Sequence, residues 1–301
     1  MVKVKAWISA ARLRTLPLSV SGIITGSAMA YDAGVFRWSV FALALLTTLG
    51  FQVLSNFAND YGDGVKGTDN HERVGPMRAM QSGLLSEADL KRGMAFTILV
   101  TMLIAMALIY TAFGSDDFVI SLVFFLLGIG AILAAVKYTV GRSAYGYRGL
   151  GDVFVFIFFG LLAVAGSFFL YAHQLNAAVF LPAITVGLWS AAVLNLNNMR
   201  DRIPDARAQK NTLAVLLGEK ASKTYHFALI VVGFLAVLVY FLITNDWQWA
   251  GVALIIILPL GKHLLKVTRN ESPALLDPEL KKVALSTFFF ALLFALGYVF
   301  S

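Results

Sequence analysis

Long stretches without a charged residue recur along the chain, and most positions within them are apolar. They comprise residues 15–31, 38–59, 93–115, 118–136, 153–199, 224–245, 247–261 and 283–301. A helix of about 20 apolar residues is long enough to cross the hydrocarbon core of a bilayer. The pattern therefore predicts a series of membrane-spanning α-helices.

The longest of these stretches, residues 153–199, is too long for one span and contains a polar interruption. The interruption reads Y-A-H-Q-L-N, from Tyr171 to Asn176, and it predicts a turn between two helices. Nine spans follow from this reading. The expected fold is an all-α polytopic membrane protein made of a single domain, residues 1–301.

Composition supports a membrane protein and removes some kinds of chemistry. The chain is 59% hydrophobic and 14% charged, with a mean hydropathy of +0.77, which lies outside the ordinary soluble class. It has no cysteine, so disulfides, thiolate catalysis and cysteine-type zinc sites are excluded. The four histidines lack metal-ligand spacing, and we expect polar or interfacial roles for His71, His173, His226 and His263.

Lysine and arginine are unevenly divided between the two sides that nine spans create. With alternating loops, all of the 24 basic residues except Arg37 share the side of the N-terminus. Basic residues collect on the cytoplasmic side of membrane proteins, so we expect the N-terminus and the functional face to be cytoplasmic. The net charge of +7 then reflects topology and an anionic ligand rather than nucleic-acid binding, and no obligate protein partner is evident.

Two clusters of asparagine and aspartate stand out because each ends an apolar stretch. They read N-F-A-N-D-Y-G-D at residues 56–63 and N-N-M-R-D-R-I-P-D at residues 197–205. Residues three, four or seven apart share one face of a helix. The trios with this spacing are Asn56, Asp60 and Asp63, and Asn198, Asp201 and Asp205. Carboxylates at a helix C-terminus oppose the macrodipole, so we expect a cation to offset each cluster.

Basic residues follow both clusters. They are Lys66, Arg73 and Arg78 after the first cluster and Lys210 after the second. Oxygen ligands suit Mg²⁺, which is usually shared between one or two carboxylates and substrate phosphates. Carboxylates beside Lys and Arg are what a Mg²⁺-bound diphosphate requires. Any one aspartate alone is better explained as solvating a loop end, but two matched clusters favour a binding site.

A diphosphate handled by a polytopic protein at the membrane surface suggests a lipid diphosphate whose isoprenoid tail lies among apolar helices. Departure of the diphosphate leaves an allylic cation, which the faces of aromatic rings stabilise. Tyrosines near the predicted inner helix ends are candidates for this role, although aromatic residues there are also typical of the interfacial belt. They are Tyr61, Tyr138, Tyr145 and Tyr147.

Two segments resemble the paired aspartate motifs of the UbiA superfamily of prenyltransferases. The first is N-D-Y-G-D-G-V-K-G-T-D at residues 59–69, and the second comprises N-N-M-R-D-R-I-P-D and K-N-T-L within residues 197–213. Three more segments are similar to the branch that prenylates 1,4-dihydroxy-2-naphthoate in menaquinone synthesis. They are A-R-L-R-T-L-P at 11–17, R-V-G-P-M-R-A-M-Q-S-G at 73–83 and Y-G-Y-R-G-L-G-D at 145–152.

The resemblance implies a nine-helix bundle around a central cavity that opens laterally to lipid. Inner loops at residues 60–90 and 199–223 would cap this cavity. It further implies Mg²⁺-dependent transfer of a polyprenyl group from polyprenyl diphosphate to 1,4-dihydroxy-2-naphthoate, with decarboxylation, giving demethylmenaquinone. The enzyme would work in the cell (inner) membrane with its active site facing the cytoplasm.

The resemblance also implies roles for individual residues. The residues implied to hold Mg²⁺ and diphosphate through carboxylates are Asp60, Asp63, Asp69, Asp201 and Asp205. Those expected to bind substrate are Asn56, Asn59, Lys66, Arg78, Tyr145, Asn198 and Lys210, with Asp152 or Tyr138 on the acceptor side.

One departure and two alternatives limit this reading. The branch usually carries Gly-Pro where this chain has Gly141 followed by Arg142, so the role of that loop in acceptor binding stays open. Only residues 73–83 argue against other acceptors, namely 4-hydroxybenzoate, homogentisate, haem or a chlorin. A cation-coupled secondary transporter is less favoured, because it predicts ionisable residues near the bilayer midplane, whereas here they lie at one edge.

Overall fold

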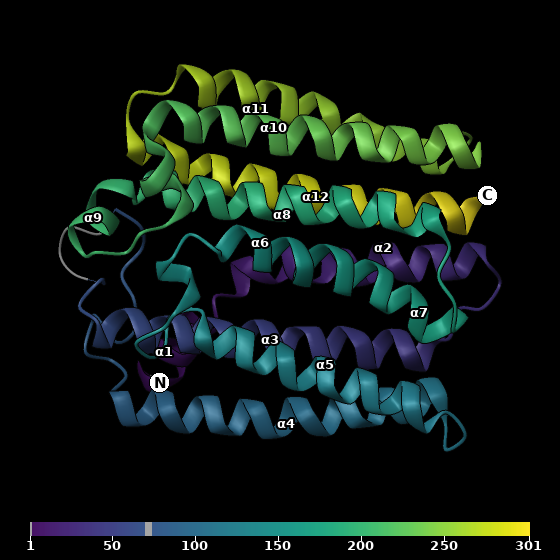
Figure 1. Cartoon of the computed structure of the whole chain (residues 1–301), viewed down its shortest axis with the longest axis horizontal. Helices are drawn as coiled ribbons and strands as arrows, with labels where there is room; N and C mark the ends of the chain where they lie inside the picture. The colour runs from purple at the N-terminus through teal and green to yellow at the C-terminus, as the bar shows by residue number, and fades with distance from the viewer. Residues whose placement is uncertain (1, 70–73) are drawn as a thin grey trace.

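The computed structural model describes residues 2–69 and 74–301, and its long helices run side by side along one axis (Figure 1). The α-helices are α1 (Val2–Ala11), α2 (Leu16–Asp32), α3 (Trp38–Val65), α4 (Glu87–Phe113), α5 (Phe118–Lys137), α6 (Gly151–Val155), α7 (Ser167–Ala172), α8 (Phe180–Arg200), α9 (Arg202–Arg207), α10 (Leu213–Thr244), α11 (Ile257–Arg269) and α12 (Asp277–Phe300). Shorter helical segments are η1 (Leu13–Thr15), η2 (Tyr145–Tyr147), η3 (Phe156–Gly166), η4 (Ala177–Val179), η5 (Ala250–Ile256) and η6 (Pro273–Leu276). Arg73, one of the predicted basic residues, lies outside the described residues.

Eight helical segments of the described chain are long and apolar enough to cross a membrane by length and composition. The chain is thus an all-helical, multi-pass membrane protein, as predicted. The turn expected within residues 153–199 is confirmed, because α7 ends at Ala172 and η4 begins at Ala177. The first charge-free stretch forms α2, whose 17 residues are fewer than the about 20 that a perpendicular span needs. The ninth span therefore stays a prediction.

Small residues bring three of these helices into close contact. A Cβ atom added to Gly26 of α2 would lie 2.1 Å from Oγ of Ser167, and one added to Gly160 of η3 would lie 2.7 Å from Cα of Gly187 in α8. Helices in membranes associate through such close approach of backbones. The segment from η3 to α7 is consequently held between α2 and α8.

The segment η3 is a π-helix that joins α6 to α7 within one span, Gly151–Ala172. Its i→i+5 hydrogen bonds widen the turn, so its side chains do not follow the spacing of an α-helix. Nothing in the apolar sequence F-I-F-F-G-L-L-A-V-A-G predicts this change of helix type. As described below, several of its side chains line a cavity.

The second acidic cluster does not lie on one continuous helix. The helix α8 ends at Arg200, Asp201 has φ −94° and ψ 9°, and α9 begins at Arg202. Pro204 has no N–H group to donate to the carbonyl of Arg200, which favours a break at this point. Asn198, Asp201 and Asp205 therefore fall on α8, on the junction and on α9, rather than on one helix face as expected.

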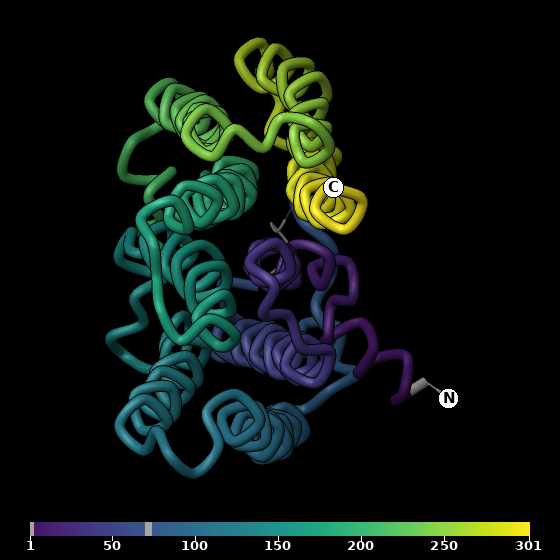
Figure 2. The backbone as a smooth tube through the Cα atoms, turned by 90° about the vertical axis from the view of Figure 1, so that its right-hand side faces the viewer, coloured from purple at the N-terminus to yellow at the C-terminus, as the bar shows by residue number. Residues whose placement is uncertain are grey.

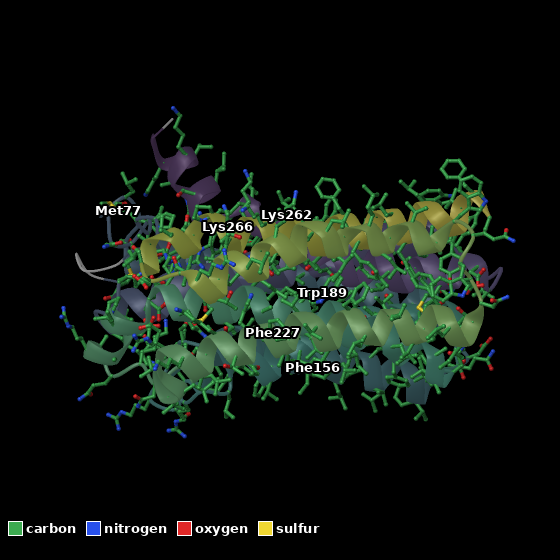
Figure 3. All side chains as sticks on the ribbon, turned by 90° about the horizontal axis from the view of Figure 1, so that it is seen from above. Met77, Phe156, Trp189, Phe227, Lys262 and Lys266 are labelled. Atoms are coloured by element: carbon green, nitrogen blue, oxygen red, sulfur yellow. The ribbon has the colours of Figure 1, made fainter. Side chains whose placement is uncertain are left out.

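The three C-terminal helices lie together on one side of the bundle (Figure 2). The helix α10 packs against α8, α12 packs against α2 and α8, and α11 packs against α10 and α12. Trp189 of α8 lies in the middle of the molecule (Figure 3) and donates a 3.1 Å hydrogen bond to the carbonyl of Ile230 in α10. A buried polar chain joins α10, α11 and α12. In it, Nε2 of His226 lies 2.7 Å from Nε2 of His263, whose Nδ1 lies 2.8 Å from Glu279. Both histidines are fully buried, so of the polar and interfacial roles expected for them they have the polar one.

Arg37, the basic residue predicted to lie apart from the others, caps two helix ends. Its guanidinium group donates to the carbonyls of Thr111 (3.0 Å) and Ala112 (3.2 Å) at the end of α4, and of Leu170 (3.0 Å) near the end of α7. Carbonyls of the last helical turn lack partners within their own helix, and a cation there complements the helix dipole. A structural role therefore accounts for this residue.

Candidate active site

A cavity of about 380 Å³ lies among α2, α3, α4, α5, the η3 span and α8. One end is polar, and its lining comprises Arg12, Asn59, Asp63, Arg78, Tyr138, Tyr145, Asn197, Asn198, Asp201 and Lys210. The remainder is mostly apolar, with Ile23, Ala44, Leu108, Ile109, Phe124, Leu127, Phe158, Phe159, Leu162 and Leu170 in its wall. No described residue of α10, α11 or α12 belongs to this lining. The shape suits a molecule with a charged head and a long apolar tail.

The length of the lining supports this description. Along α3 it runs from Ala44 to Asp63, which at about 1.5 Å per residue is about 28 Å. A bilayer has a hydrocarbon core about 30 Å thick. The cavity as a whole, with its polar end included, thus extends along most of the length of α3.

Lys210 connects the two acidic motifs at the polar end. Its Nζ atom lies 3.3 Å from Oδ2 of Asp63 and 3.9 Å from Oδ1 of Asp205. Burial alone would lower the pKa of this amine, but the carboxylates of Asp63 and Asp205 outweigh burial and raise the pKa above its usual value. Lys210 is therefore a fixed positive charge between the motifs.

Tyr147 of η2 contacts the carboxylate of Asp63, the first partner of Lys210. Its hydroxyl donates a 2.7 Å hydrogen bond to Oδ1 of Asp63 and lies 2.6 Å from the hydroxyl of Thr68. The Nζ atom of Lys66 stands 3.8 Å from the centre of the Tyr147 ring, a cation–π contact. Lys66 thus contacts the loop of Tyr147 and does not line the cavity.

The remaining carboxylates of the first motif hold the segment that follows it. Asp60 is buried and accepts hydrogen bonds from the backbone N–H groups of Ala79 (3.2 Å) and Met80 (3.4 Å). Asp69 is also buried, with its Oδ2 atom 3.8 Å from Nε of Arg78. Neither aspartate lines the cavity, whereas Arg78 does. Asp60 thus holds the backbone immediately after Arg78, and Asp69 lies beside the Arg78 side chain at the cavity wall.

Asp201 of the second motif lines the cavity but already has a cationic partner. Arg200 donates to both of its carboxylate oxygens, at 3.0 and 2.7 Å. The same guanidinium donates to Asn197 at 2.8 Å and contacts Asp277 of α12. Such a two-point pair fixes geometry as well as charge. Arg200, which does not itself line the cavity, therefore orients the Asp201 carboxylate.

Asn56 was predicted to bind substrate, and the structure places it behind the cavity wall. Its Nδ2 atom donates to the carbonyl of Ala11 (2.8 Å) and to the hydroxyl of Thr15 (3.2 Å). Between these two residues Arg12 has a left-handed backbone, with φ 51°, and lines the cavity. A non-glycine residue in this region is uncommon and is often found at functional sites.

Two tyrosines form an aromatic wall beside the polar end. The rings of Tyr138 and Tyr145 meet edge to face at 5.3 Å, and Tyr145 stacks on Phe154 at 3.9 Å. Burial, followed by the nearby charge of Asp152, raises the pKa of Tyr138, so its phenol is neutral. Asp152 itself is buried beside the Tyr225 hydroxyl and does not line the cavity.

The predicted residues fall into two groups. Those that meet at the cavity are Asn59, Asp63, Arg78, Tyr138, Tyr145, Asn198, Asp201 and Lys210. Those that lie outside its lining are Asn56, Asp60, Tyr61, Lys66, Asp69, Tyr147, Asp152 and Asp205. Sequence reasoning assigned no site role to Arg12 or Arg200 and did not connect Tyr147 to Asp63. Arg12 and Arg200 both lie within motifs that the sequence analysis quoted, and this was the only signal for a site role. The contact of Asn56 that places Arg12 is long-range, and the contact of Arg200 with Asp201 depends on the helix break.

The oxygen donors at the polar end suit Mg²⁺ shared with a phosphate. Among the described residues, no group of three or more His, Asp or Glu side chains is arranged as a metal site. Mg²⁺ usually takes only one or two protein carboxylates and completes its shell with water and phosphate oxygens. Asp63 on α3 and Asp201 after α8, each with an asparagine of its motif, face the same cavity and provide such a donor set.

Comparisons with known proteins agree with this geometry. The model of the UbiA prenyltransferase family matches residues 19–293. The chain is 44% identical to the 1,4-dihydroxy-2-naphthoate octaprenyltransferase of Haemophilus influenzae, over 98% of this chain and 96% of that protein. Identity to the Escherichia coli protein of the same name is 40%, over 98% and 95%.

A solved structure has a similar fold. It is a UbiA homologue from Archaeoglobus fulgidus bound to DMAPP and Mg²⁺, with a TM-score of 0.60 and 16% identity over 94% of this chain and 98% of that chain. The resemblance carried by the two aspartate motifs is confirmed by the family match, which covers most of the sequence. The chain therefore belongs to the UbiA prenyltransferase family.

Proposed function

We propose that this enzyme transfers a polyprenyl group from polyprenyl diphosphate to 1,4-dihydroxy-2-naphthoate, with loss of the acceptor carboxylate, and so forms the quinol, which is the reduced form of demethylmenaquinone. The observation that carries the proposal is the contact of Lys210 with both acidic motifs at the head of a long apolar cavity. The acceptor is supported by the names of the relatives from Haemophilus influenzae and Escherichia coli.

Among the described residues, three basic side chains line the polar end and suit the diphosphate. They are Arg12, Arg78 and Lys210, from three separate segments of the chain. Charge-assisted hydrogen bonds from such groups to phosphate oxygens are short and strong. Because two of the three are held in place by carboxylates, Arg78 by Asp69 and Lys210 by Asp63 and Asp205, they are oriented before substrate binds.

Asp63, Asp201, Asn59 and Asn198 line the same end, and we propose that their oxygen atoms hold Mg²⁺. When bound, Mg²⁺ supplies positive charge that stabilises the departing diphosphate. Asp60, Asp69 and Asp205 remain candidate ligands by their place in the motifs, and their contacts with Ala79, Arg78 and Lys210 also give them a positioning role.

Heterolysis of the allylic C–O bond leaves a cation that needs a dry, electron-rich surrounding. The rings of Tyr138 and Tyr145 border the polar end and present aromatic faces to such a cation. The apolar lining beyond them excludes water, which would otherwise capture the cation. Asp152, buried behind Tyr138, is proposed to act on the acceptor side through that phenol.

The transfer step exchanges one carbon–carbon bond for another. The ring carbon that bears the carboxylate bonds to the allylic carbon, and the bond to the carboxylate then breaks. Carbon dioxide leaves, and the electron pair of the broken bond restores the aromatic ring. No proton has to be removed from that carbon, so this step needs no base at the ring.

The proposed topology follows from the distribution of basic residues. We infer nine spans in a single domain, residues 1–301, with α2 as the additional span and the N-terminus in the cytoplasm. The segments 60–90 and 199–223 would then cap the site on the cytoplasmic side of the cell (inner) membrane. The 17 residues of α2 can still span the membrane, because a bilayer thins locally around a short helix at modest cost.

The test is turnover by purified protein in vesicles. Polyprenyl diphosphate is supplied with 1,4-dihydroxy-2-naphthoate, 4-hydroxybenzoate, homogentisate, haem or a chlorin, with and without Mg²⁺. We expect prenylated product from the naphthoate alone and only with the metal. Product from another acceptor instead would refute the proposed acceptor, and absence of product from all of them would refute the proposed reaction.

A further inference from the structure

The N-terminal helix α1 differs from the other helices in direction. It projects sideways from the bundle at the end where α2 begins and α3 ends (Figures 2 and 3). The long helices follow the bundle axis (Figure 1). If that axis crosses the membrane, α1 lies in the plane of the membrane surface. Its 10 residues then extend about 15 Å along that surface.

One stripe of α1 fastens it to the bundle. Ala6 and Ala10, one helical turn apart, are 1% and 2% exposed. Beside them the ring of Trp7 meets the ring of Phe57 at 5.2 Å, edge to face. A Cβ atom at Gly93 of α4 would lie 2.6 Å from the Trp7 ring, so the fit of this ring requires glycine there. The helix is therefore a fixed part of the fold.

The other two stripes of α1 are exposed and differ in character. Val4 and Ile8, again one turn apart, are 62% and 51% exposed. Lys5 and Ser9 form the adjacent stripe and are also exposed. A helix with one apolar and one polar exposed stripe is typical of peptides that lie in the lipid headgroup layer. Leu13, two residues after the end of the helix, adds a third exposed apolar side chain.

Charge identifies the kind of surface that fits these stripes. Lys3, Lys5 and Arg14 lie in or next to α1 and are exposed, although Nζ of Lys3 also lies 3.4 Å from Asp89 of α4. No acidic residue occurs in the sequence before Asp32. Anionic phospholipids attract such basic segments, whereas an uncharged lipid surface offers only burial of apolar side chains. We propose that α1 is an interfacial helix bound to anionic phospholipid headgroups, with Val4 and Ile8 inserted among the upper acyl chains.

The lipid contact has a route to the cavity. The last residue of α1, Ala11, accepts the hydrogen bond from Asn56, and the next residue, Arg12, lines the polar end. An α1 bound at the membrane surface thus fixes the end of the helix from which the Arg12 side chain reaches the site. This consequence rests on the proposed function, but the lipid contact of α1 does not.

The absence of cysteine from the sequence makes a direct test available. Single cysteines are introduced as Val4→Cys, Ile8→Cys, Lys5→Cys and Ser9→Cys, all at exposed positions, and each is labelled with an environment-sensitive fluorophore. The proteins are reconstituted in vesicles of phosphatidylglycerol and phosphatidylcholine that contain a lipid with a nitroxide near the headgroup. Iodide serves as the water-soluble quencher.

We expect the nitroxide lipid to quench labels at positions 4 and 8 several-fold more than labels at 5 and 9, with the opposite order for iodide. The difference should shrink in vesicles of phosphatidylcholine alone. Equal quenching at all four positions would overturn the proposal. So would labels at 4 and 8 that are shielded from both quenchers and that self-quench between copies, because a second protein molecule would then cover the stripe. Both readouts are independent of catalysis.

Discussion

The Nζ atom of Lys210 lies 3.3 Å from Oδ2 of Asp63, although the two residues come from opposite halves of the chain and from different acidic motifs. Asp205 lies 3.9 Å from the same amine. Each motif therefore depends on the other for its charge balance. A diphosphate at this point would meet a cation that both motifs have already placed.

Replacing Lys210 by methionine should greatly reduce turnover. The change removes a cation proposed to stabilise the leaving diphosphate, and loss of one such donor costs about 10²–10³-fold in kcat. Lys210→Arg should retain more activity because it keeps the charge. The matched control is Lys66→Met, which removes an exposed lysine beside Tyr147 and outside the cavity lining. Equal losses in Lys66→Met and Lys210→Met would contradict the assigned position of the diphosphate.

Asp63→Asn and Asp201→Asn should each abolish turnover while the protein still folds and inserts. Both changes keep the shape of the side chain and remove the charge that we propose for Mg²⁺ binding. Activity is measured against Mg²⁺ concentration, and folding by thermal unfolding in detergent. Asp117→Asn, at an exposed position before α5, is the control. Near-normal turnover in either cavity variant would assign that aspartate to a structural role alone.

Asn56 and Arg12 should act as one unit. Arg12→Ala removes a charged donor to the diphosphate, and such a bond contributes about 1.5–3 kcal/mol, so KM for polyprenyl diphosphate should rise about tenfold or more. Asn56→Ala should raise the same KM, because it removes the hydrogen bonds to Ala11 and Thr15 that hold the backbone on either side of Arg12. The double variant should resemble Arg12→Ala alone, because residues that act through each other are not additive. Additive effects on KM would show that Asn56 acts independently of Arg12.

Glu279→Ala should destabilise the fold without affecting substrate binding. It leaves His263 and Lys282 without their carboxylate partner at 2.8 and 2.6 Å. A buried hydrogen-bonding group left without its partner, here the His263 ring, costs about 1–3 kcal/mol, so the thermal midpoint should fall. Glu271→Ala, at an exposed position, should leave the midpoint unchanged. A changed KM for either substrate in Glu279→Ala, at unchanged stability, would place this network in the site.

The sequence predicted the helices and the two motifs well because both depend on local information. Hydropathy over a span-length window located the helices, and the polar residues from Tyr171 to Asn176 located a turn that the structure contains. The motifs end α3 and α8 as expected, and their basic neighbours Arg78 and Lys210 do face the cavity.

Contacts between distant segments were not predictable in this way. No local pattern indicates that Tyr147 donates to Asp63, or that Asn56 donates to the carbonyl of Ala11 just before Arg12. The break at Asp201 could have been inferred from Pro204, but its consequence, the two-point contact with Arg200, depends on packing. The apolar composition of η3 likewise does not indicate that this segment is π-helical.

The most direct test of the proposed reaction follows the carboxylate of the acceptor. Purified protein in vesicles is given polyprenyl diphosphate and 1,4-dihydroxy-2-naphthoate labelled in its carboxyl carbon, with Mg²⁺ or with a chelator. The proposed reaction predicts labelled carbon dioxide and prenylated product in equal amounts, and neither when the metal is removed. Prenylated product that keeps the label, or turnover that continues in the chelator, would contradict it.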